Sequence, residues 1–210
     1  LLGQSRTINL GIADNIAIDL SGTLTLSGSA QINSVIYLQS GTLNTGGNSF
    51  YLKSDANGTA MINSNGGGLL VGDITMEAYI DNTYGYHFLS SPMTNATVEQ
   101  FNDDFTLNLS GANPHVYTYD ESNTSNNISD GWIAAQSVLD LMTVGKGYAC
   151  LFDATNGRTI DIEGQPNDGP ISIPLTYTAS VPIDNSVYAP QGWNFIGNPY
   201  PSSIDFNTLI

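Results

Sequence analysis

Positive charge is scarce in this chain of 210 residues. Four Lys and Arg residues stand against 19 Asp and Glu residues, which gives a formal net charge of −15. A phosphate backbone would be repelled by this balance, so nucleic acid is excluded as a partner, and anionic membrane surfaces are disfavoured by the same sign. Because no apolar run reaches the roughly 20 residues that a spanning helix needs, we expect no membrane insertion.

Cysteine and histidine are also nearly absent. Cys150 is the only cysteine, so no intrachain disulfide can form, and its alternating context predicts a small, buried core residue. The two histidines, His87 and His115, and one cysteine make a zinc site improbable. Neither a Gly-x-Ser-x-Gly elbow nor a His-Glu-x-x-His motif occurs. We therefore expect no enzyme, no catalytic residue and no organic cofactor.

Short β-type runs separated by Gly and Asn fill residues 7–80, and this region has no proline. A Gly-Thr pair recurs at 22–23, 41–42 and 58–59, with spacings of 19 and then 17 residues. A strand after each turn at a spacing near 20 is typical of stacked solenoid coils, each of which buries its apolar face on the next. The pattern favours a β-solenoid over 1–80, with an antiparallel sandwich joined by hairpins as the alternative.

Residues 81–210 differ in composition from residues 1–80, because they contain aromatic residues at a higher frequency and all nine prolines. Successive strand-like runs are separated by turn signals, which predicts an antiparallel β-sandwich module. The predicted fold class is therefore all-β, a solenoid followed by a sandwich. Residues 97–104 resemble a capped helical turn, and residues 134–142 have a composition that allows either a short helix or a loop.

One sequence pattern occurs twice, as YHFLSSPMTNATVEQFN at 86–102 and WNFIGNPYPSSIDFNTL at 193–209. Such an echo predicts a duplicated structural element rather than an active site, and it predicts that the recurring aromatic residues belong to the core. Because the second copy reaches Ile210, we expect its fold unit to continue beyond the sequence. The recurring aromatic positions are Tyr86 with Trp193 and Phe88 with Phe195.

These motifs resemble a known group of proteins. GWNFIGNPYPSSIDF at 192–206, YHFLSSPMT at 86–94 and GKGYACLF at 145–152 are similar to a module of secreted multidomain surface proteins of the Bacteroidota. The resemblance covers about 81–210, and the upstream Gly/Thr/Asn repeats resemble the solenoid-like stretches that often precede this module. It implies export by the type IX secretion system and an extracellular or outer cell-surface location, and it implies no particular activity.

Two kinds of site are candidates. Calcium prefers several carboxylate and carbonyl oxygens, and Asp103, Asp104 and Asp168 could supply them, although a solvated acidic surface explains the same residues. Planar amphipathic rings suit stacking on sugars, and Trp132 is the best candidate for an exposed binding ring. Its neighbours in the candidate ligand site are Tyr117 and Tyr119.

The favoured function is an extracellular or cell-surface structural or adhesive protein, a stalk or filament-forming module without catalysis. Its partners would be other surface proteins, copies of itself or an extracellular polysaccharide. The alternative is a carbohydrate-binding module of a larger secreted polysaccharide-degrading enzyme, which requires exposed rings around Trp132. A third hypothesis, a β-helix polysaccharide lyase or hydrolase, requires two carboxylates such as Asp73 and Glu77 to face each other across a cleft.

Overall fold

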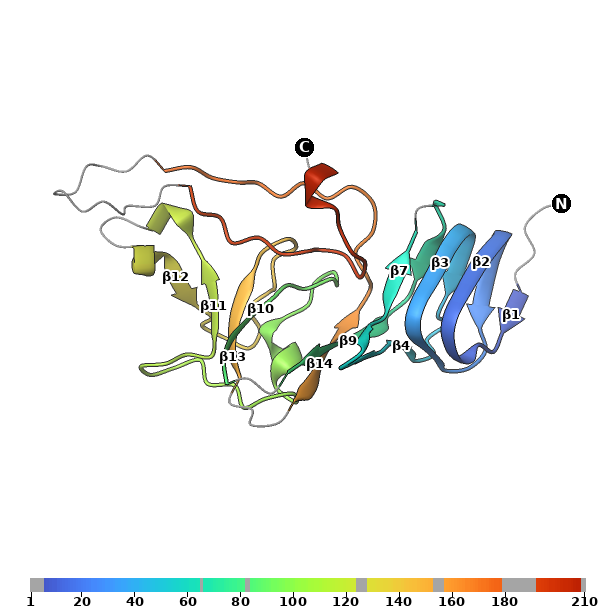
Figure 1. The fold of residues 1–210 in the computed structure, drawn as a ribbon, viewed down its shortest axis with the longest axis horizontal. Helices are drawn as coiled ribbons and strands as arrows, with labels where there is room; N and C mark the ends of the chain where they lie inside the picture. The colour runs from blue at the N-terminus through green and yellow to red at the C-terminus, as the bar shows by residue number, and fades with distance from the viewer. Residues whose placement is uncertain are drawn as a thin grey trace.

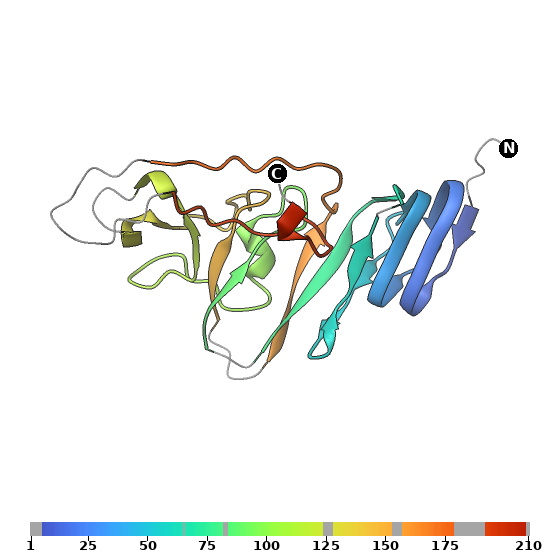
Figure 2. The same ribbon diagram turned by 45° about the horizontal axis from the view of Figure 1, so that its top comes forward.

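The computed structural model describes residues 6–64, 66–81, 84–123, 128–152, 157–178 and 192–208. Within these residues all regular structure is β-strand apart from short 3-10 turns, which confirms the predicted all-β class. The molecule is elongated, with the solenoid at one end and the antiparallel sheet toward the other (Figures 1 and 2).

The strands fall into two larger sheets and one small hairpin. In chain order they are β1 (Arg6–Ile8), β2 (Gly11–Leu26), β3 (Ala30–Asn44), β4 (Phe50–Leu52), β5 (Ser54–Asp55), β6 (Gly58–Thr59), β7 (Met61–Asn63), β8 (Leu69–Val71), β9 (Ile74–Ile80), β10 (Gly85–Leu89), β11 (Val116–Tyr119), β12 (Trp132–Ala134), β13 (Tyr148–Phe152) and β14 (Arg158–Gly164). The 3-10 turns are η1 (Val98–Phe101), η2 (Glu121–Asn123), η3 (Ile128–Gly131) and η4 (Phe206–Thr208).

The N-terminal part is a β-solenoid of about four turns, as its repeat spacing predicts. β1, β2, β3 and β4 follow one another as parallel neighbours, and β7 and β8 also pair with β3. The long strands β2 and β3 contain register shifts where the chain turns a corner of the coil. Stacking the coils pairs their backbone groups and leaves fewer strand edges open.

The Gly-Thr repeat marks the coil for its first two copies only. Thr23 is the direct partner of Thr42, and Gly41 passes so close to the preceding coil that a Cβ would lie 2.5 Å from the Leu20 carbonyl oxygen. The third pair, 58–59, instead forms β6 of the small hairpin with β5, and Leu69 takes the place beside Thr42. An inserted hairpin therefore breaks the repeat that the sequence predicts.

Alternation along β3 builds the solenoid core. Ile32, Ile36 and Leu38 are buried, whereas Tyr37 points outward. This period of two is what a strand with one covered face requires.

The solenoid continues directly into the next part of the chain through β9. This strand pairs parallel with β4 and antiparallel with β14, which comes from the C-terminal half. The Gln165 side chain, just after β14, accepts a hydrogen bond from the Gly72 N–H at 2.7 Å and donates one to the Leu70 carbonyl at 3.1 Å. The Ile62 N–H donates to the Pro201 carbonyl at 2.8 Å. These contacts cover the edge of the last coil.

The second large sheet is antiparallel, in the order β10-β13-β11-β12. Its buried face packs on a cluster of phenylalanines, in which the Phe105 ring lies 4.5 Å from the Phe152 ring and 5.7 Å from the Phe101 ring, centroid to centroid. Phe101 comes from η1, so a helical turn does form within 97–104, but the predicted cap is absent because the Thr97 side chain makes no capping hydrogen bond. The patch 134–142 is not helical; it begins at the end of β12 and continues as irregular chain.

The duplicated segments lie side by side along one stretch of chain. β10, in the first copy, pairs antiparallel with β13, and Ile196, in the second copy, forms an antiparallel bridge with Lys146 just before β13. Both copies therefore run in the same direction, and both end in a 3-10 turn, η1 in the first and η4 in the second. The repeat in the sequence therefore corresponds to a repeated element in the structure.

Candidate functional site

One face of the antiparallel sheet collects most of its aromatic side chains. Residues directly opposite each other in an antiparallel pair share a face, as do alternate residues along a strand. Phe88 is opposite Ala149, Ala149 is opposite Tyr117, and Tyr119 is opposite Trp132. These residues therefore point to one side, which we call the aromatic face; Tyr86, two residues before Phe88, belongs to it as well.

The opposite face closes the core. Val116, Cys150 and Phe152 alternate with the residues of the aromatic face, and all three are fully buried. Burial raises the pKa of the Cys150 thiol to about 12, so this residue is an inert core side chain, as its sequence context predicts.

A hollow of about 510 Å³ opens on the aromatic face. Ala149 occupies the central strand between two aromatic neighbours, Phe88 and Tyr117. Because its side chain is a single methyl group, the larger rings on either side stand above it and leave space between them. The lining residues are Tyr86, Phe88, Tyr117, Ser129, Trp132 and Ala149.

A chain of ring contacts fixes the walls of this hollow. The Trp132 indole contacts Tyr119 at 5.2 Å and Phe195 at 5.6 Å, and Phe195 contacts Phe88 at 5.0 Å, all edge-to-face between ring centroids. Edge-to-face pairs of this kind add about 0.5–1.5 kcal/mol each beyond burial. The rings are therefore held in place before any ligand arrives.

The exposure of the rings corrects one expectation and supports another. The recurring aromatic residues were expected in the core, but Phe88 is 68% exposed and Trp193 is 62% exposed. That prediction is wrong because the buried face of the sheet is the one carrying Cys150 and Phe152. Trp132 is 38% exposed, whereas Tyr119, its neighbour on the same face, is only 7% exposed and contacts the Trp132 indole edge-to-face.

The hollow is electrically neutral. None of its lining residues carries a formal charge. The Tyr86 hydroxyl donates to the Pro114 carbonyl at 3.2 Å, and burial, with the neighbouring Tyr117 phenol, raises the pKa of Tyr86 above its ordinary value. This phenol therefore stays protonated at neutral pH.

The buried carboxylate of Glu121 anchors the chain near Tyr119. Glu121, in η2, accepts hydrogen bonds from the Thr178 N–H, the Thr178 hydroxyl at 3.0 Å and the Gly192 N–H at 3.2 Å. These bonds lower the pKa of Glu121, and the bond from the Thr178 N–H has the largest effect. They tie η2 to the start of the second copy, which supplies Phe195 to the aromatic face.

The three calcium candidates do not come together. Asp104 accepts a hydrogen bond from the Asp161 N–H at 3.0 Å, and burial, reinforced by the charges of Asp161 and Asp103, raises its pKa to about 6. Asp168 lies elsewhere, beside the last solenoid coil. Among the described residues, no group of three or more His, Cys, Asp or Glu side chains is placed to hold a metal ion.

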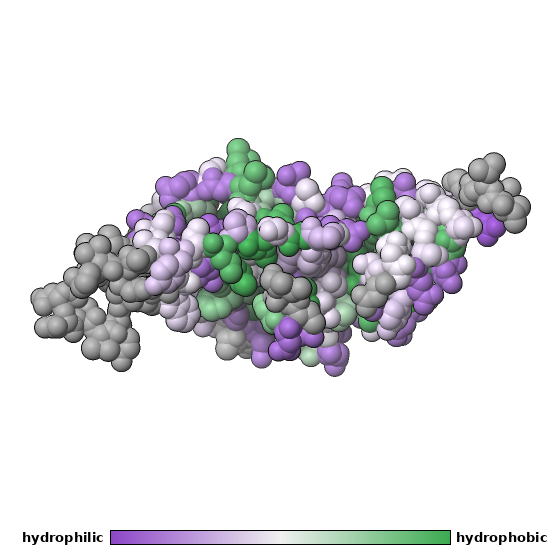
Figure 3. Space-filling view, turned by 90° about the horizontal axis from the view of Figure 1, so that it is seen from above, coloured by the Kyte–Doolittle hydropathy of each residue, from purple (hydrophilic) through white to green (hydrophobic). Residues whose placement is uncertain are grey.

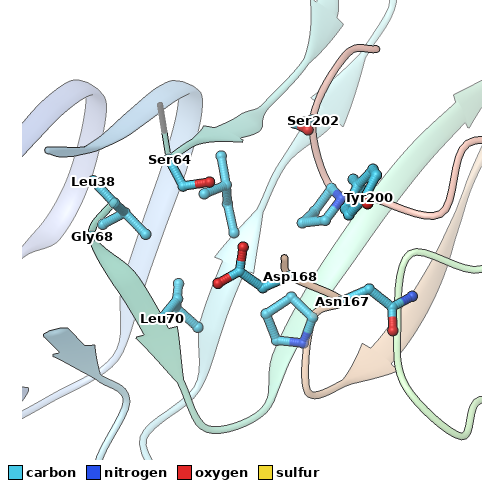
Figure 4. Close-up of a pocket in the computed structure, with 11 residues that line it drawn as sticks. Leu38, Ser64, Gly68, Leu70, Asn167, Asp168, Tyr200 and Ser202 are labelled. Carbon is cyan, nitrogen blue, oxygen red and sulfur yellow. The ribbon is translucent and has the colours of Figure 1, made fainter. Parts of the chain in front are cut away.

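Asp168 lines a small cavity between the solenoid and the C-terminal segment. Figure 4 shows it between Leu70 and Tyr200, with Ser64 and Ser202 at the rim. The cavity is only about 40 Å³, which is room for water rather than for an organic ligand.

The carboxylates required by the lyase or hydrolase hypothesis are separated. Glu77 is buried, paired with Lys53, and bonded by the Ser54 N–H at 3.1 Å. Asp73 lines a different, polar hollow of about 430 Å³ at a corner of the solenoid, together with Glu163. Asp73 and Glu77 thus do not share a hollow.

Hydrophobic side chains also gather on a second surface. Figure 3 shows them over the middle of the molecule, where the segments 165–178 and 192–208 cross it in Figure 1. The exposed ones include Leu175, Ile196 and Phe206. These three side chains do not belong to the lining of the hollow.

These features define an all-β protein in which a β-solenoid leads into an antiparallel module with an open aromatic face. The chain belongs to the family described as Domain of unknown function (DUF8693), whose match covers residues 4–210. No curated protein and no solved structure matches the chain. Among the described residues, none forms a helix long and apolar enough to cross a membrane.

Proposed function

We propose that this chain is an extracellular or cell-surface protein with a structural or adhesive role and without catalysis. The solenoid is a stiff spacer, and the antiparallel module presents a binding surface. The observation that carries the proposal is the aromatic face, whose rings are exposed on a sheet joined to the solenoid through β9 and β14. The resemblance to type IX secretion cargo of the Bacteroidota supports the location.

The solenoid supports the spacer role through its hydrogen bonding. Parallel pairing runs from β1 to β4 and on to β9, and β14 then pairs antiparallel with β9. Motion between coils would break these ladders, so force applied to one end is transmitted to the module. β1 is the outer strand of the described sheet, and other surface proteins or copies of the chain are the proposed partners of this protein.

Location is tested on intact cells of the organism that encodes the chain. Antibody against the purified chain should label unpermeabilised cells or detect the protein in the medium. Signal found only after permeabilisation would contradict an extracellular role.

Sedimentation of the purified chain at rising concentration tests self-assembly. A monodisperse monomer at every concentration would contradict the filament version of the proposal.

The second candidate function is carbohydrate binding in the service of a larger secreted polysaccharide-degrading enzyme. It is favoured by the exposure of Trp132 beside Tyr86 and Phe88 around one hollow. Pull-down on a panel of insoluble polysaccharides, with calcium and with chelator, tests it; retention supports binding, and release by chelator would add a calcium site. Assay of reducing ends in the same tubes should show no hydrolysis, and their appearance would revive the enzyme hypothesis.

A further inference from the structure

We propose that the hollow over Ala149 is a binding site for an uncharged pyranose unit of an extracellular polysaccharide, and that it works without a metal ion. The inference rests on the proposed adhesive function and assigns its ligand class. The lining combines apolar ring surface with hydroxyl groups, and its volume of about 510 Å³ lies within the roughly 300–1,000 Å³ typical of small-molecule sites.

The shape of the site suits a flat, amphipathic ligand. A pyranose ring has C–H bonds on its faces and hydroxyl groups around its rim. Aromatic faces carry partial negative charge and attract such C–H groups. Phe88 and Tyr117 stand on either side of Ala149, and Trp132, which is opposite Tyr119, is the diagonal neighbour of Tyr117 on β12. A sugar ring placed over the Ala149 methyl would therefore meet aromatic surface on more than one side.

Polar atoms at the rim match the edge of a sugar. Tyr86, Tyr117 and Ser129, each of which carries a hydroxyl group, belong to the lining. The Tyr86 hydroxyl donates to the Pro114 carbonyl and is also hydrogen-bonded with the Tyr117 side chain, and its remaining lone pair can accept from a sugar hydroxyl. An entirely apolar partner would bury these hydroxyl groups without new hydrogen bonds, at a cost in affinity.

Charge selects a neutral sugar over an acidic one. No cationic side chain lines the hollow. Two of the four basic residues are engaged elsewhere, Lys53 with Glu77 and Arg158 with the Asp104 carbonyl oxygen. The chain carries a net charge of −15, which repels uronate and sulfate groups. No carboxylate lines the hollow either, so its chemistry offers nothing for a bridging cation.

The variant Trp193→Phe leaves Trp132 as the single tryptophan and makes the site directly visible by fluorescence. It is titrated with cellohexaose, xylohexaose, maltohexaose and chitohexaose as neutral probes, and with hexagalacturonate as the acidic probe. We expect saturable change of the Trp132 emission with at least one neutral probe, unchanged by chelator, and none with hexagalacturonate.

Two further substitutions in this background locate the binding. Ala149→Leu fills the hollow and should weaken binding by more than tenfold, and Phe88→Ala removes one wall and should weaken it by about tenfold, the loss expected for one aromatic contact. Tyr37→Ala is the matched control, because Tyr37 is 39% exposed but lies on the solenoid, and it should bind unchanged. Circular dichroism of each variant confirms that the fold is kept.

Several results would overturn the inference. Binding that persists in Ala149→Leu would place the site elsewhere, and preference for hexagalacturonate or release by chelator would contradict a neutral, metal-free site; both leave the adhesive function standing. Failure of all four neutral probes, with the fold intact, rejects the pyranose assignment. Capture of a protein through the hollow, lost in Ala149→Leu, would replace the sugar by a protein partner. The proposed location fails only in the separate cell-labelling experiment.

Discussion

Phe88 and Phe195 occupy the same position in the two copies of the duplicated segment, 107 residues apart, and their rings touch at 5.0 Å between centroids. A second equivalent pair, Ser90 and Gly197, is also in contact, since a Cβ built on Gly197 would lie 2.3 Å from the Ser90 Cβ. The two copies therefore pack on each other in register. Through Phe195, the second copy supports a wall of the aromatic face.

Gly197→Ala tests this packing. The added methyl group has no room beside Ser90, and the overpacking should lower the free energy of unfolding by about 1–3 kcal/mol. Amide hydrogen exchange should rise at Gly147, whose N–H donates to the Phe195 carbonyl at 2.9 Å. Gly58→Ala is the control, because nothing lies within 4 Å of a Cβ there. Equal stability of the two variants would show that the copies are not tightly packed.

The sequence predicts the solenoid better than the aromatic face. Stacked coils repeat their corner residues, so the positions of Thr23 and Thr42 along the chain already indicate the length of one coil. The hairpin of β5 and β6 interrupts the next repeat, so the spacing can no longer be recognised. The coil tolerates this insertion because extra residues at a corner reduce its stability little. For the solenoid, alternation on β3 predicts both the period and the buried side.

For the antiparallel sheet, alternation predicts the two faces but not which one is covered. Both faces carry large apolar residues, Phe88 on one and Phe152 on the other. The buried face is chosen by Phe101 and Phe105, which arrive from a segment outside the sheet. The local sequence of the strands does not encode that contact. The hollow likewise cannot be predicted from Ala149 alone, because a small residue leaves a hollow only when its cross-strand neighbours are large.

Gln165 should be essential to the end of the solenoid. Its side-chain amide both accepts from the Gly72 N–H and donates to the Leu70 carbonyl, as a neighbouring strand would. Gln165→Leu leaves both groups without this partner and should cost about 1–3 kcal/mol of stability in urea unfolding. Gln39→Leu, at an exposed position on β3, should change stability little. Matching midpoints for the two variants would contradict this role.

Asp104 should make stability depend on pH. Its pKa is raised from 3.8 to about 6 in the folded protein, first by burial. As the pH rises from about 4 to 6, the unfolded chain loses this proton before the folded protein does, so the contribution of Asp104 to stability falls and stays low above pH 6. Asp104→Asn should therefore be neutral near pH 3.5 and stabilising by about 1 kcal/mol at pH 7, a value reduced for partial solvent contact.

Urea unfolding across this pH range measures the difference between Asp104→Asn and the unmodified chain. Gln39→Leu is the control because it changes no carboxyl group, so its difference from the unmodified chain should not vary with pH. A constant difference for Asp104→Asn at every pH would show that the carboxyl is not destabilised by burial.

The central claim is that the aromatic face is the surface through which this protein binds, and hydroxyl-radical footprinting tests it most directly. The chain is oxidised free and bound to the polysaccharide that retains it in the pull-down, and modification is read at each aromatic residue by mass spectrometry. We predict protection of Trp132, Phe88 and Tyr86, with Tyr37 on the solenoid unchanged. Retention without protection of the aromatic face, or protection of the solenoid alone, would contradict the claim.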